Sequence, residues 1–417
     1  MNPRIIALLA VLASAGQAFA GEPTNVPGHP GQVHAVRAHK PDHAGDNRPY
    51  VPSVLTQFGD PLPGLTAAQL NLFLDGKDDF EKTEDVAGGL GPIFNRDSCV
   101  ACHSSPATGG ASAINVTRFG MTVNGKFDSL DSLGGSLLQE NAITPEAQEF
   151  VPSIANVVIH RNSTPLFGLG LIDAIPDSEI VRNAKAYPNE HIKGRVGWVT
   201  DVVSGKRMAG RFGWKAQQAT VLAFAADAYR NEMGVTNRYF PTENAPNGSA
   251  EKLAKTDFVL DPEDAPATGL ADFEKVANFM SFLAPPPVSK PTPTTASGRM
   301  LFEAAACSLC HTPSMRTGYS KIAALNNKEV RLYSDLLLHD MGSLGDGIVQ
   351  ETATGRDFRT PPLWGIAQSA PYLHDGRAVT IDEAIKGHDG EGKVSKDRYL
   401  KMTKAQQKLL TDFVLSL

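Results

Sequence analysis

The chain has 417 residues, of which 39 are Lys or Arg and 45 are Asp or Glu, so its formal net charge is −6. This acidic balance excludes nucleic acid as the main partner, because a polyanion binds basic surfaces. A composition of 41% hydrophobic and 20% charged residues excludes wholesale disorder, and the length predicts two or three domains.

The N-terminus has the pattern of a secretory signal peptide. Arg4 precedes the apolar run IIALLAVLASAG, and an A-x-A motif follows at residues 18–20. One positive charge, a short apolar core and a small-residue end predict a signal peptide over residues 1–20. A membrane-spanning helix needs roughly 20 apolar residues, and this run is shorter. We therefore expect a periplasmic protein whose mature chain does not span the membrane.

Residues 21–53 are rich in Pro, Gly and His. Clustered imidazoles bind divalent metals, so a metal-binding arm is one interpretation of this segment. The other is a flexible, solvated tail, which is favoured because no periodic apolar pattern holds the histidines in place. The four histidines concerned are His29, His34, His39 and His43.

Residues 99–103 and 307–311 both read C-x-x-C-H and contain all four cysteines of the chain. Two thiols one helical turn apart can form thioethers to the two vinyl groups of one haem, and the following His can bind the iron. Half a zinc site or a redox dithiol would use one such motif, and two complete copies argue against both. We therefore predict two covalently bound c-type haems, held by Cys99, Cys102, His103, Cys307, Cys310 and His311.

The surroundings of the two motifs also repeat. Helical apolar spacing precedes each motif, at 65–81 and from 297 onward, and recurs at 270–287 and at 403–417, where each half ends. The Pro-rich segment 285–297 predicts a semi-rigid linker that is neither helix nor central strand. We expect a mainly α fold of two cytochrome c-like haem domains, 54–284 and 298–417, with long loops. Alternating segments at 114–123 and 196–203 predict minor β-hairpins.

Residues 357–391 read DFRTPPLWGIAQSAPYLHDGRAVTIDEAIKGHDGE. This segment resembles the superfamily of bacterial di-haem cytochrome c peroxidases and MauG-type enzymes. Within it, the chain is most similar to the di-haem oxidoreductase family, often labelled thiol oxidoreductase. That similarity also rests on YSDLLLHDMG at 333–342, TPLFGLGLIDAIP at 164–176 and GRFGWKA at 210–216. The match runs in order from about Leu65 to the C-terminus.

The resemblance implies a sixth ligand for the C-terminal haem. In the peroxidases this ligand is a Met fourteen residues after the His of H-D-G, and His388 takes that place here. His311 and His388 would then form a bis-histidine site, which has a lower potential than His/Met ligation. Met341 is the alternative, because a downstream Met is the usual distal ligand of mono-haem cytochromes c. His339 is a weaker one, and His388 as a surface residue is another interpretation.

The sequence offers no clear distal ligand for the iron of the first haem. In many peroxidase relatives a His soon after the motif caps this iron, but residues 104–120 contain no His. We expect this haem to be five-coordinate or water-ligated and open to peroxide. Met121 and His160 are alternative ligands.

Residues 210–234, GRFGWKAQQATVLAFAADAYRNEMG, resemble the peroxidase pattern W-D-G-R-A…N-x-x-E-M. The resemblance implies that Trp214 lies between the haems and relays an electron, and that Glu232 is the distal acid that helps to break the O–O bond. The chain departs from the pattern, since W-D-G-R is W-K-A-Q here and the stretch before Glu232 is two residues shorter. A core Trp and a solvated helical Glu are the alternative interpretations.

Two further expectations concern bound groups. Arg161 and Arg359 are candidates to pair with haem propionates, because a guanidinium suits a carboxylate. Analogy with the superfamily implies a Ca²⁺ ion at the domain interface, near the backbone oxygens of Ser369 and Pro371.

The resemblance implies a periplasmic oxidoreductase that reduces peroxide at the N-terminal haem. Electrons would come through the C-terminal haem from a small cytochrome c or a cupredoxin. One alternative is a di-haem electron carrier without a substrate of its own, and another is a MauG-like or thiol-oxidising enzyme. A redox-active protein dithiol is excluded, because no Cys lies outside the two motifs.

Overall fold

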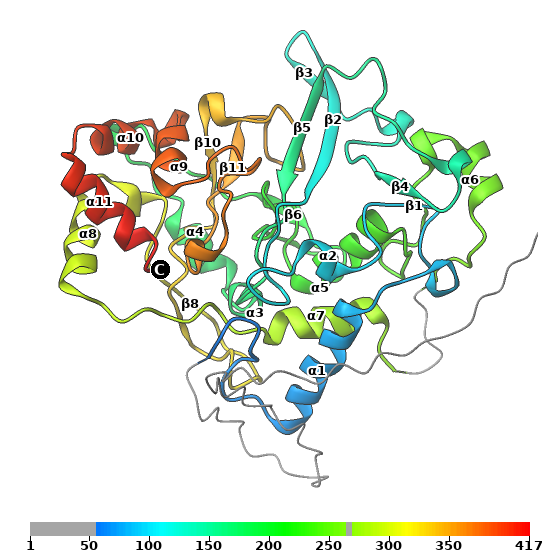
Figure 1. The fold of residues 1–417 in the computed structure, drawn as a ribbon, viewed down its shortest axis with the longest axis horizontal. Coiled ribbons are helices and arrows are strands. Elements are labelled where there is room, and N and C mark those ends of the chain that lie inside the picture. Colours follow the sequence, from blue (N-terminus) through cyan, green and yellow to red (C-terminus); the bar gives the residue numbers. More distant parts are fainter. Residues whose placement is uncertain (1–55, 264–268) are drawn as a thin grey trace, which may run out of the picture. The chain divides into compact units, whose positions relative to one another are not determined.

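The same pair of packed helices occurs in both halves of the chain, next to each C-x-x-C-H motif (Figure 1). The computed structural model describes residues 56–263 and 269–417. The predicted signal peptide and the predicted tail lie outside the described residues.

The first pair consists of α1 (Ala67–Glu81) and α7 (Asp272–Phe282). Helix α1 begins after Thr66, whose hydroxyl accepts a hydrogen bond from the Gln69 N–H at 3.2 Å, as an N-cap residue does. The ring of Phe279 lies 4.9 Å from that of Phe80, centroid to centroid. The helices approach so closely that a Cβ built on Gly76 would lie 2.0 Å from the Lys275 carbonyl oxygen.

The second pair consists of α8 (Pro293–Ala304) and α11 (Lys404–Val414). The rings of Phe302 and Phe413 lie 5.4 Å apart. A Cβ on Gly298 would lie 2.1 Å from the Leu409 carbonyl oxygen. Both pairs are therefore built from an aromatic contact and a glycine at the point of closest approach.

Helix α8 begins inside the segment for which a linker without helix was predicted. Residues 293–297 are helical, and that part of the prediction was wrong. Proline is tolerated at the first position of a helix because its missing N–H has no partner there. Thr292 caps this end, its hydroxyl accepting a hydrogen bond from the Thr295 N–H at 3.2 Å.

The remaining helices are shorter, and a π-helix directly continues α5. Short 3₁₀ turns connect many of them. The bounds are α2 (Cys99–Cys102), α3 (Leu169–Asp173), α4 (Asp177–Asn183), α5 (Val221–Ala228), the π-helix (Tyr229–Met233), α6 (Ala250–Thr256), α9 (Ile381–Gly387) and α10 (Lys393–Leu400).

The β-structure is a minor component, as predicted. Its largest sheet is antiparallel and has the order β3-β2-β5, formed by β2 (Asn115–Val123), β3 (Lys126–Asp128) and β5 (Val157–Asn162). The other sheets are antiparallel pairs, namely β1 (Ile93–Phe94) with β4 (Asn141–Ala142), β6 (Trp198–Thr200) with β7 (Arg207–Ala209), β8 (Met315–Arg316) with β9 (Glu329–Val330), and β10 (Leu338–Asp340) with β11 (Asp357–Arg359).

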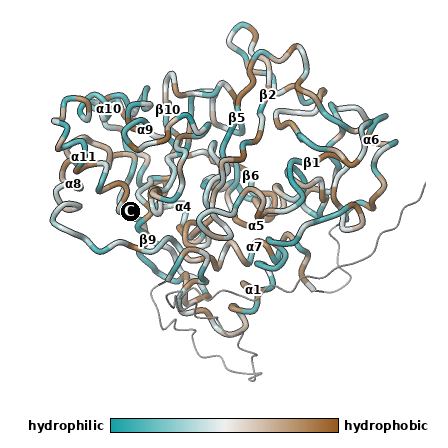
Figure 2. Tube along the Cα trace, viewed as in Figure 1, coloured by the Kyte–Doolittle hydropathy of each residue, from teal (hydrophilic) through white to brown (hydrophobic). Residues whose placement is uncertain are grey.

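Two main clusters of buried apolar side chains form the core. The larger surrounds α1, α5 and α7, where hydrophobic residues concentrate along α5 (Figure 2), and it includes Leu332 and Leu336 from the second half of the chain. The smaller lies between α8, α9 and α11. Because the larger cluster takes residues from both halves, the halves share one hydrophobic core.

A buried ion cluster also joins the two halves. Asp346 accepts hydrogen bonds from Arg161 at 2.9 Å (Nε) and 2.6 Å (Nη2), and its other oxygen lies 3.0 Å from Lys215 Nζ. Burial lowers the pKa of Lys215 to about 8, although Asp346 opposes this shift. Burial alone would raise the pKa of Asp346, but the two cations hold it below its usual value. Arg161 is thus bound to Asp346, and its pairing with a propionate stays a prediction.

Replacing Asp346 by Asn should destabilise the protein by about 3–5 kcal/mol, because two buried cations would lose their counter-charge. The free energy of unfolding in urea measures this effect. The control is Asp412→Asn, which removes an exposed pair with Lys408 and should cost about 1 kcal/mol or less. Equal losses in the two variants would contradict the assigned role of Asp346.

Candidate functional site

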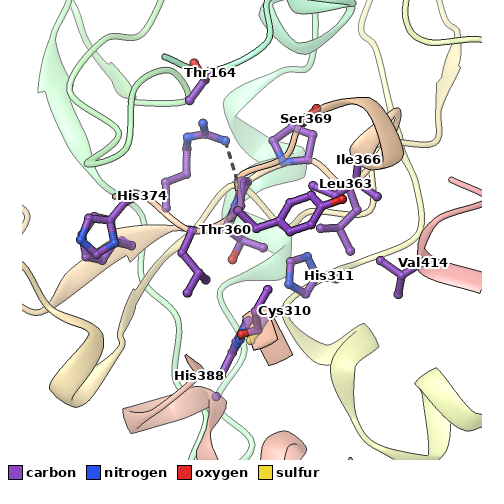
Figure 3. Close-up of a pocket in the computed structure, with 18 of the residues that line it drawn as sticks. Thr164, Cys310, His311, Thr360, Leu363, Ile366, Ser369, His374, His388 and Val414 are labelled. Carbon is purple, nitrogen blue, oxygen red and sulfur yellow. Dashed lines mark hydrogen bonds between the residues drawn. The ribbon is translucent and has the colours of Figure 1, made fainter. Parts of the chain in front are cut away.

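The second C-x-x-C-H motif opens into the main cavity of the described residues, which has about 1900 Å³ of empty space, its open mouth included (Figure 3). Its walls are mostly apolar, which suits a haem macrocycle. They come from the second half of the chain and, in the first half, from residues 162–165, Phe167, Leu169, Ile172, Arg211 and Trp214. Cys307, Cys310, His311, Met341, His374 and His388 line it.

His311 and His388 are oriented by backbone carbonyls. His311 Nδ1 lies 3.0 Å from the Tyr333 carbonyl oxygen, and His388 Nδ1 lies 2.8 Å from that of Ala384. An Nδ1–H donated to a carbonyl leaves Nε2 as the free lone pair, which is the state a metal-ligating imidazole requires. Burial, followed by the nearby His388, lowers the pKa of His311 to about 4. The donor set of this cavity therefore fits a haem.

Met341 also lies close to His388. A Cβ built on Gly392 would lie 3.0 Å from His388 Cδ2 and 3.3 Å from Met341 Cε. The structure therefore brings both predicted alternatives for the sixth ligand to one wall of the cavity.

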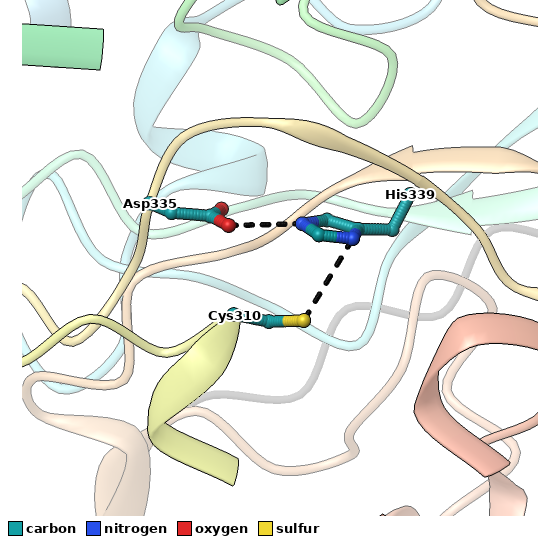
Figure 4. A group of neighbouring side chains, drawn as sticks. All are labelled: Cys310, Asp335 and His339. Carbon is teal, nitrogen blue, oxygen red and sulfur yellow. Dashed lines mark hydrogen bonds and ion pairs between the residues drawn. The ribbon is translucent and has the colours of Figure 1, made fainter. Parts of the chain in front are cut away.

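His339 is held differently, as Figure 4 shows for two of its neighbours. Its Nε2 lies 2.9 Å from Asp335, its Nδ1 lies 2.7 Å from Glu391, and the same Nδ1 is 3.7 Å from Cys310 Sγ. Burial alone would lower the pKa of His339, but the two carboxylates hold it well above its usual value. Both ring nitrogens are engaged, so this imidazole has no free lone pair for an iron.

Arg359 provides a cationic group in the wall of the same cavity. Its guanidinium donates to the carbonyl oxygens of Gly213 at 2.9 Å and Thr360 at 3.2 Å. Within 56–263 and 269–417 no carboxylate forms an ion pair with it, and burial lowers its pKa to about 10. A buried cation without a counter-charge is a site for an anionic group such as a haem propionate.

The first motif forms α2, with His103 at its C-terminal end. His103 Nδ1 lies 3.0 Å from the Gly110 carbonyl oxygen, which again leaves Nε2 free. Phe80 of α1 lies 6.2 Å from the His103 ring, as Phe302 of α8 lies 6.3 Å from His311. The two motifs therefore have equivalent supports.

The thiols of both motifs are poor nucleophiles in this environment. Burial raises the pKa of Cys99 to about 12 and that of Cys102 to about 11, and in the second motif that of Cys307 to about 12. A buried thiol of high pKa is not the reactive thiolate of a redox dithiol.

Glu232 is positioned beside the first motif by the π-helix Tyr229–Met233. Its carboxylate accepts a hydrogen bond from Asn95 Nδ2 at 2.8 Å, and its charge contributes to the raised pKa of Cys102. Burial raises the pKa of Glu232 more than Asn95 and Arg118 lower it. Glu232 is therefore not a solvated helical residue, and π-helical turns are frequent at functional sites.

Arg118 is a residue of this site that the sequence analysis missed. It lies on β2, its Nη1 donates to Ser136 Oγ at 3.3 Å, and its buried Nε has no hydrogen-bond partner among the described residues. Burial lowers the pKa of Arg118, although Glu232 and Asp227 oppose this. The site thus combines a carboxylate with a guanidinium that has an unused donor. One Arg among many gives no sequence signal.

Trp214 lies in the wall of the cavity at the second motif. Its Nε1 donates to the Asn162 carbonyl oxygen at 3.0 Å, and its ring lies 6.3 Å from that of His374 in the cavity wall. The residue after Asn162, Ser163, donates from its hydroxyl to the Cys102 carbonyl oxygen at 2.8 Å. A short chain of contacts therefore runs from Trp214 to the first motif.

The two alternative ligands of the first haem lie on strands. His160 is exposed on β5, with its Nδ1 3.3 Å from Thr117 Oγ1. Met121 lies on β2, opposite Asp128 of β3.

The two motifs and the oriented histidines define an oxidoreductase that uses two haems. Residues 154–417 match the family described as "Di-haem oxidoreductase, putative peroxidase", and the chain belongs to this family. No curated protein matches the sequence significantly. The family implies two haems and a general di-haem peroxidase-like role.

Some solved structures are distantly similar. Hydrazine synthase of Kuenenia stuttgartiensis shares 13% identity at a TM-score of 0.38, covering 94% of this chain and 100% of that one. A MauG-like protein associated with microbial copper homeostasis shares 16% identity at 0.37, covering 91% and 95%. The di-haem peroxidase BthA of Burkholderia thailandensis shares 14% identity at 0.35, covering 90% and 92%. At these TM-scores the likenesses do not define the fold.

In the part of the chain that the structure describes, no helix is both long enough and apolar enough to cross a membrane.

Replacing Glu232 by Gln should stabilise the folded protein at neutral pH. The pKa of Glu232 is higher in the folded state than in the unfolded state, so the folded state binds more protons. The contribution of Glu232 to the free energy of unfolding is therefore lost as the pH rises through its folded-state pKa. Urea unfolding between pH 4 and pH 8, a range that brackets the usual glutamate pKa of about 4.3, should show a gain that grows with pH. The control Glu251→Gln, in an exposed pair with Lys255, should show no such gain. A variant that is less stable at neutral pH would contradict the assignment.

Proposed function

We propose that this chain is a c-type di-haem peroxidase that reduces peroxide at the haem held by His103, with electrons passed through the haem held by His311. The observation that carries the proposal is the Glu232 carboxylate, which lies near the first motif, has a raised pKa and is close enough to Arg118 for the two charges to interact. A carboxyl group of raised pKa near a buried guanidinium is suited to moving a proton during O–O cleavage.

Two cytochrome c-like lobes, one for each haem, are part of the proposal. The repeated helix pair and the repeated Phe–His contact support them. Covalent attachment through Cys99, Cys102, Cys307 and Cys310 is supported by their half-buried positions, by their raised pKa values and by the absence of a disulfide at any of them.

When bound at the first site, haem would supply an iron that exchanges electrons with peroxide. The overall reaction takes two electrons from the donor and two protons per H₂O₂ and releases two waters. Glu232 would accept a proton from one peroxide oxygen and deliver it to the other, which leaves as water. Arg118 stabilises the negative charge that develops on the leaving oxygen, because its unpartnered Nε offers a hydrogen bond. Asn95 keeps the carboxylate oriented through its 2.8 Å hydrogen bond.

His311 and His388 would together hold the iron of the second haem. Support comes from the two carbonyl-bound Nδ1 atoms and from the electrostatic proximity of the two rings. If both histidines hold the iron, this haem would serve electron transfer and leave substrate binding to the first site. Arg359 would hold a propionate of this haem. Met341 is the alternative ligand, because it lies on the same wall.

Trp214 is proposed to relay electrons between the haems. Its ring contacts the second cavity, while its Nε1 bonds to the segment that contacts the Cys102 carbonyl.

The proposal also includes an electron donor, a periplasmic location and a Ca²⁺ ion at the domain interface. A small cytochrome c or cupredoxin in the periplasm would supply the electrons, in accord with the signal-peptide pattern of residues 1–20. A Ca²⁺ ion at the interface would use the Pro371 carbonyl, which now accepts a hydrogen bond from Asn162 Nδ2 at 3.2 Å.

Glu232→Gln should lower kcat/KM for peroxide by about 10²–10⁴-fold, the usual contribution of a positioned acid–base group. The pH profile should change as well. In the unsubstituted enzyme kcat/KM falls as the pH drops through the raised pKa of Glu232, and the variant should lose that limb. Steady-state assays with a reduced cytochrome c measure both effects. Glu146→Gln, an exposed change, should leave them intact. Full activity of Glu232→Gln would remove Glu232 from the mechanism, and absence of peroxide reduction in the unsubstituted protein would favour an electron carrier.

His388→Met should raise the reduction potential of the second haem by on the order of 0.1 V, within the span of about 0.8 V that axial ligands set. Potentiometric titration with low-temperature EPR measures the change and the ligand set. Met341→Leu is the matched control and should leave the potential unchanged. If Met341→Leu shifts the potential and His388→Met does not, Met341 is the ligand.

A further inference from the structure

A cluster of carboxylates lies around Thr236, away from both C-x-x-C-H motifs along the chain. Oxygens of Glu243, Asp257 and Asp261 lie within 4.8 Å of one another. Glu263 adjoins them, because its carboxyl group is close enough to that of Glu243 to compete with it for one proton. Four acidic side chains therefore gather in one place.

Glu243 is the unusual member of this cluster. Glu243 is only 7% exposed. Both of its carboxylate oxygens are buried and have no hydrogen-bond partner among the described residues. Glu263 Oε1 is buried and unpartnered as well. An unpaired buried carboxylate costs several kcal/mol, so such groups are normally paired or coordinate a metal.

Among the described residues, no basic side chain is paired with this cluster. Within 56–263 and 269–417, no Lys, Arg or His forms an ion pair with any of the four carboxylates. Burial, followed by the neighbouring carboxylates, raises the pKa of Glu243 to about 11. Thr236 contributes a neutral side chain, since its hydroxyl donates to Asp261 at 2.8 Å and contacts Glu263.

We propose that Glu243, Asp257, Asp261 and Glu263 form a Ca²⁺ site, with Glu243 as its buried ligand. The donors are hard oxygens only, which suits Ca²⁺ rather than a transition metal. The separations between the carboxylate oxygens fit as well. Two ligands that each lie about 2.3–2.6 Å from one ion can be up to about 5 Å apart, and the oxygens of Glu243, Asp257 and Asp261 lie within 4.8 Å of one another. This site is distinct from the Ca²⁺ ion expected near Pro371.

The proposed Ca²⁺ site adjoins the helix that carries Glu232, so binding there would affect the first haem site. Thr236 follows the π-helix Tyr229–Met233 that carries Glu232, and its backbone N–H donates to Glu263 at 2.6 Å. Asn237, next in the chain, donates to the Ala226 carbonyl at 2.9 Å. Ca²⁺ binding would therefore stabilise the segment that ends the π-helix and help to hold Glu232 in place.

Calcium binding to the purified di-haem protein tests the proposal, with CaCl₂ titrated calorimetrically after EGTA treatment. The double variant Glu243→Gln/Asp257→Asn should bind one Ca²⁺ fewer per chain, or bind it about 10-fold or more weakly, because ligand charge sets Ca²⁺ affinity. The matched control Glu251→Gln, an exposed change on α6, should bind as the unsubstituted protein does. A Ca²⁺ ion near Pro371 would remain in all three proteins.

Thermal unfolding of Glu243→Gln provides a second measurement should the double variant not fold. In EGTA this variant should be more stable than the unsubstituted protein at neutral pH, because the amide removes the cost of keeping a buried carboxyl group protonated. Added Ca²⁺ should raise the Tm of the unsubstituted protein by about 2–4 °C and that of the variant less. Equal Ca²⁺ binding by all proteins, or an equal Tm shift in both, would overturn the proposal and indicate carboxyl groups that share protons. Peroxide reduction is not part of either measurement, so the outcome is independent of the proposed function.

Discussion

The buried cluster of Arg161, Asp346 and Lys215 is the interaction on which the arrangement of the two candidate haem sites depends. It joins the end of β5 and the residue after Trp214 to a loop of the second half. Asn162 and Ser163, which follow Arg161, contact the wall of the second cavity and the backbone of the first motif. A charge cluster with three nearly inaccessible members tolerates few alternative geometries, because each shift would leave a charge unpaired. The distance between the two redox sites is therefore set by electrostatics as well as by the shared hydrophobic core.

The three histidines assigned to iron have one feature in common. His103, His311 and His388 each place Nδ1 at a backbone carbonyl, whereas His339 has carboxylates at both ring nitrogens. The first arrangement leaves a neutral imidazole with a free Nε2, and the second produces a buried imidazolium. The same side chain is thus prepared for ligation or for charge compensation by what surrounds it, and the surroundings are not visible in the residue type.

Local features of the fold were predictable because they depend on neighbours in the chain. The helix over 67–81 and its cap at Thr66 follow from apolar spacing and a Thr followed three residues later by Gln. The start of α8 was mispredicted because the prolines of the linker were interpreted only as helix breakers, although Pro293 occupies the one helical position that suits it. Arg161 was named as a candidate to pair with a propionate because the sequence around an arginine does not show which anion it binds. Its partner in the structure, Asp346, is far away in the chain.

By itself, the sequence determined the two C-x-x-C-H motifs, because two thiols and an imidazole within five residues come together within about one helical turn. It also determined the family, through long motifs read in order. The tertiary structure alone decided that Glu232 is bound to Asn95 and lies within electrostatic range of Arg118 and of Cys102 in the first motif. It likewise decided that Glu243 is buried among other carboxylates. The physical reason is that burial and charge pairing depend on which distant segments pack together.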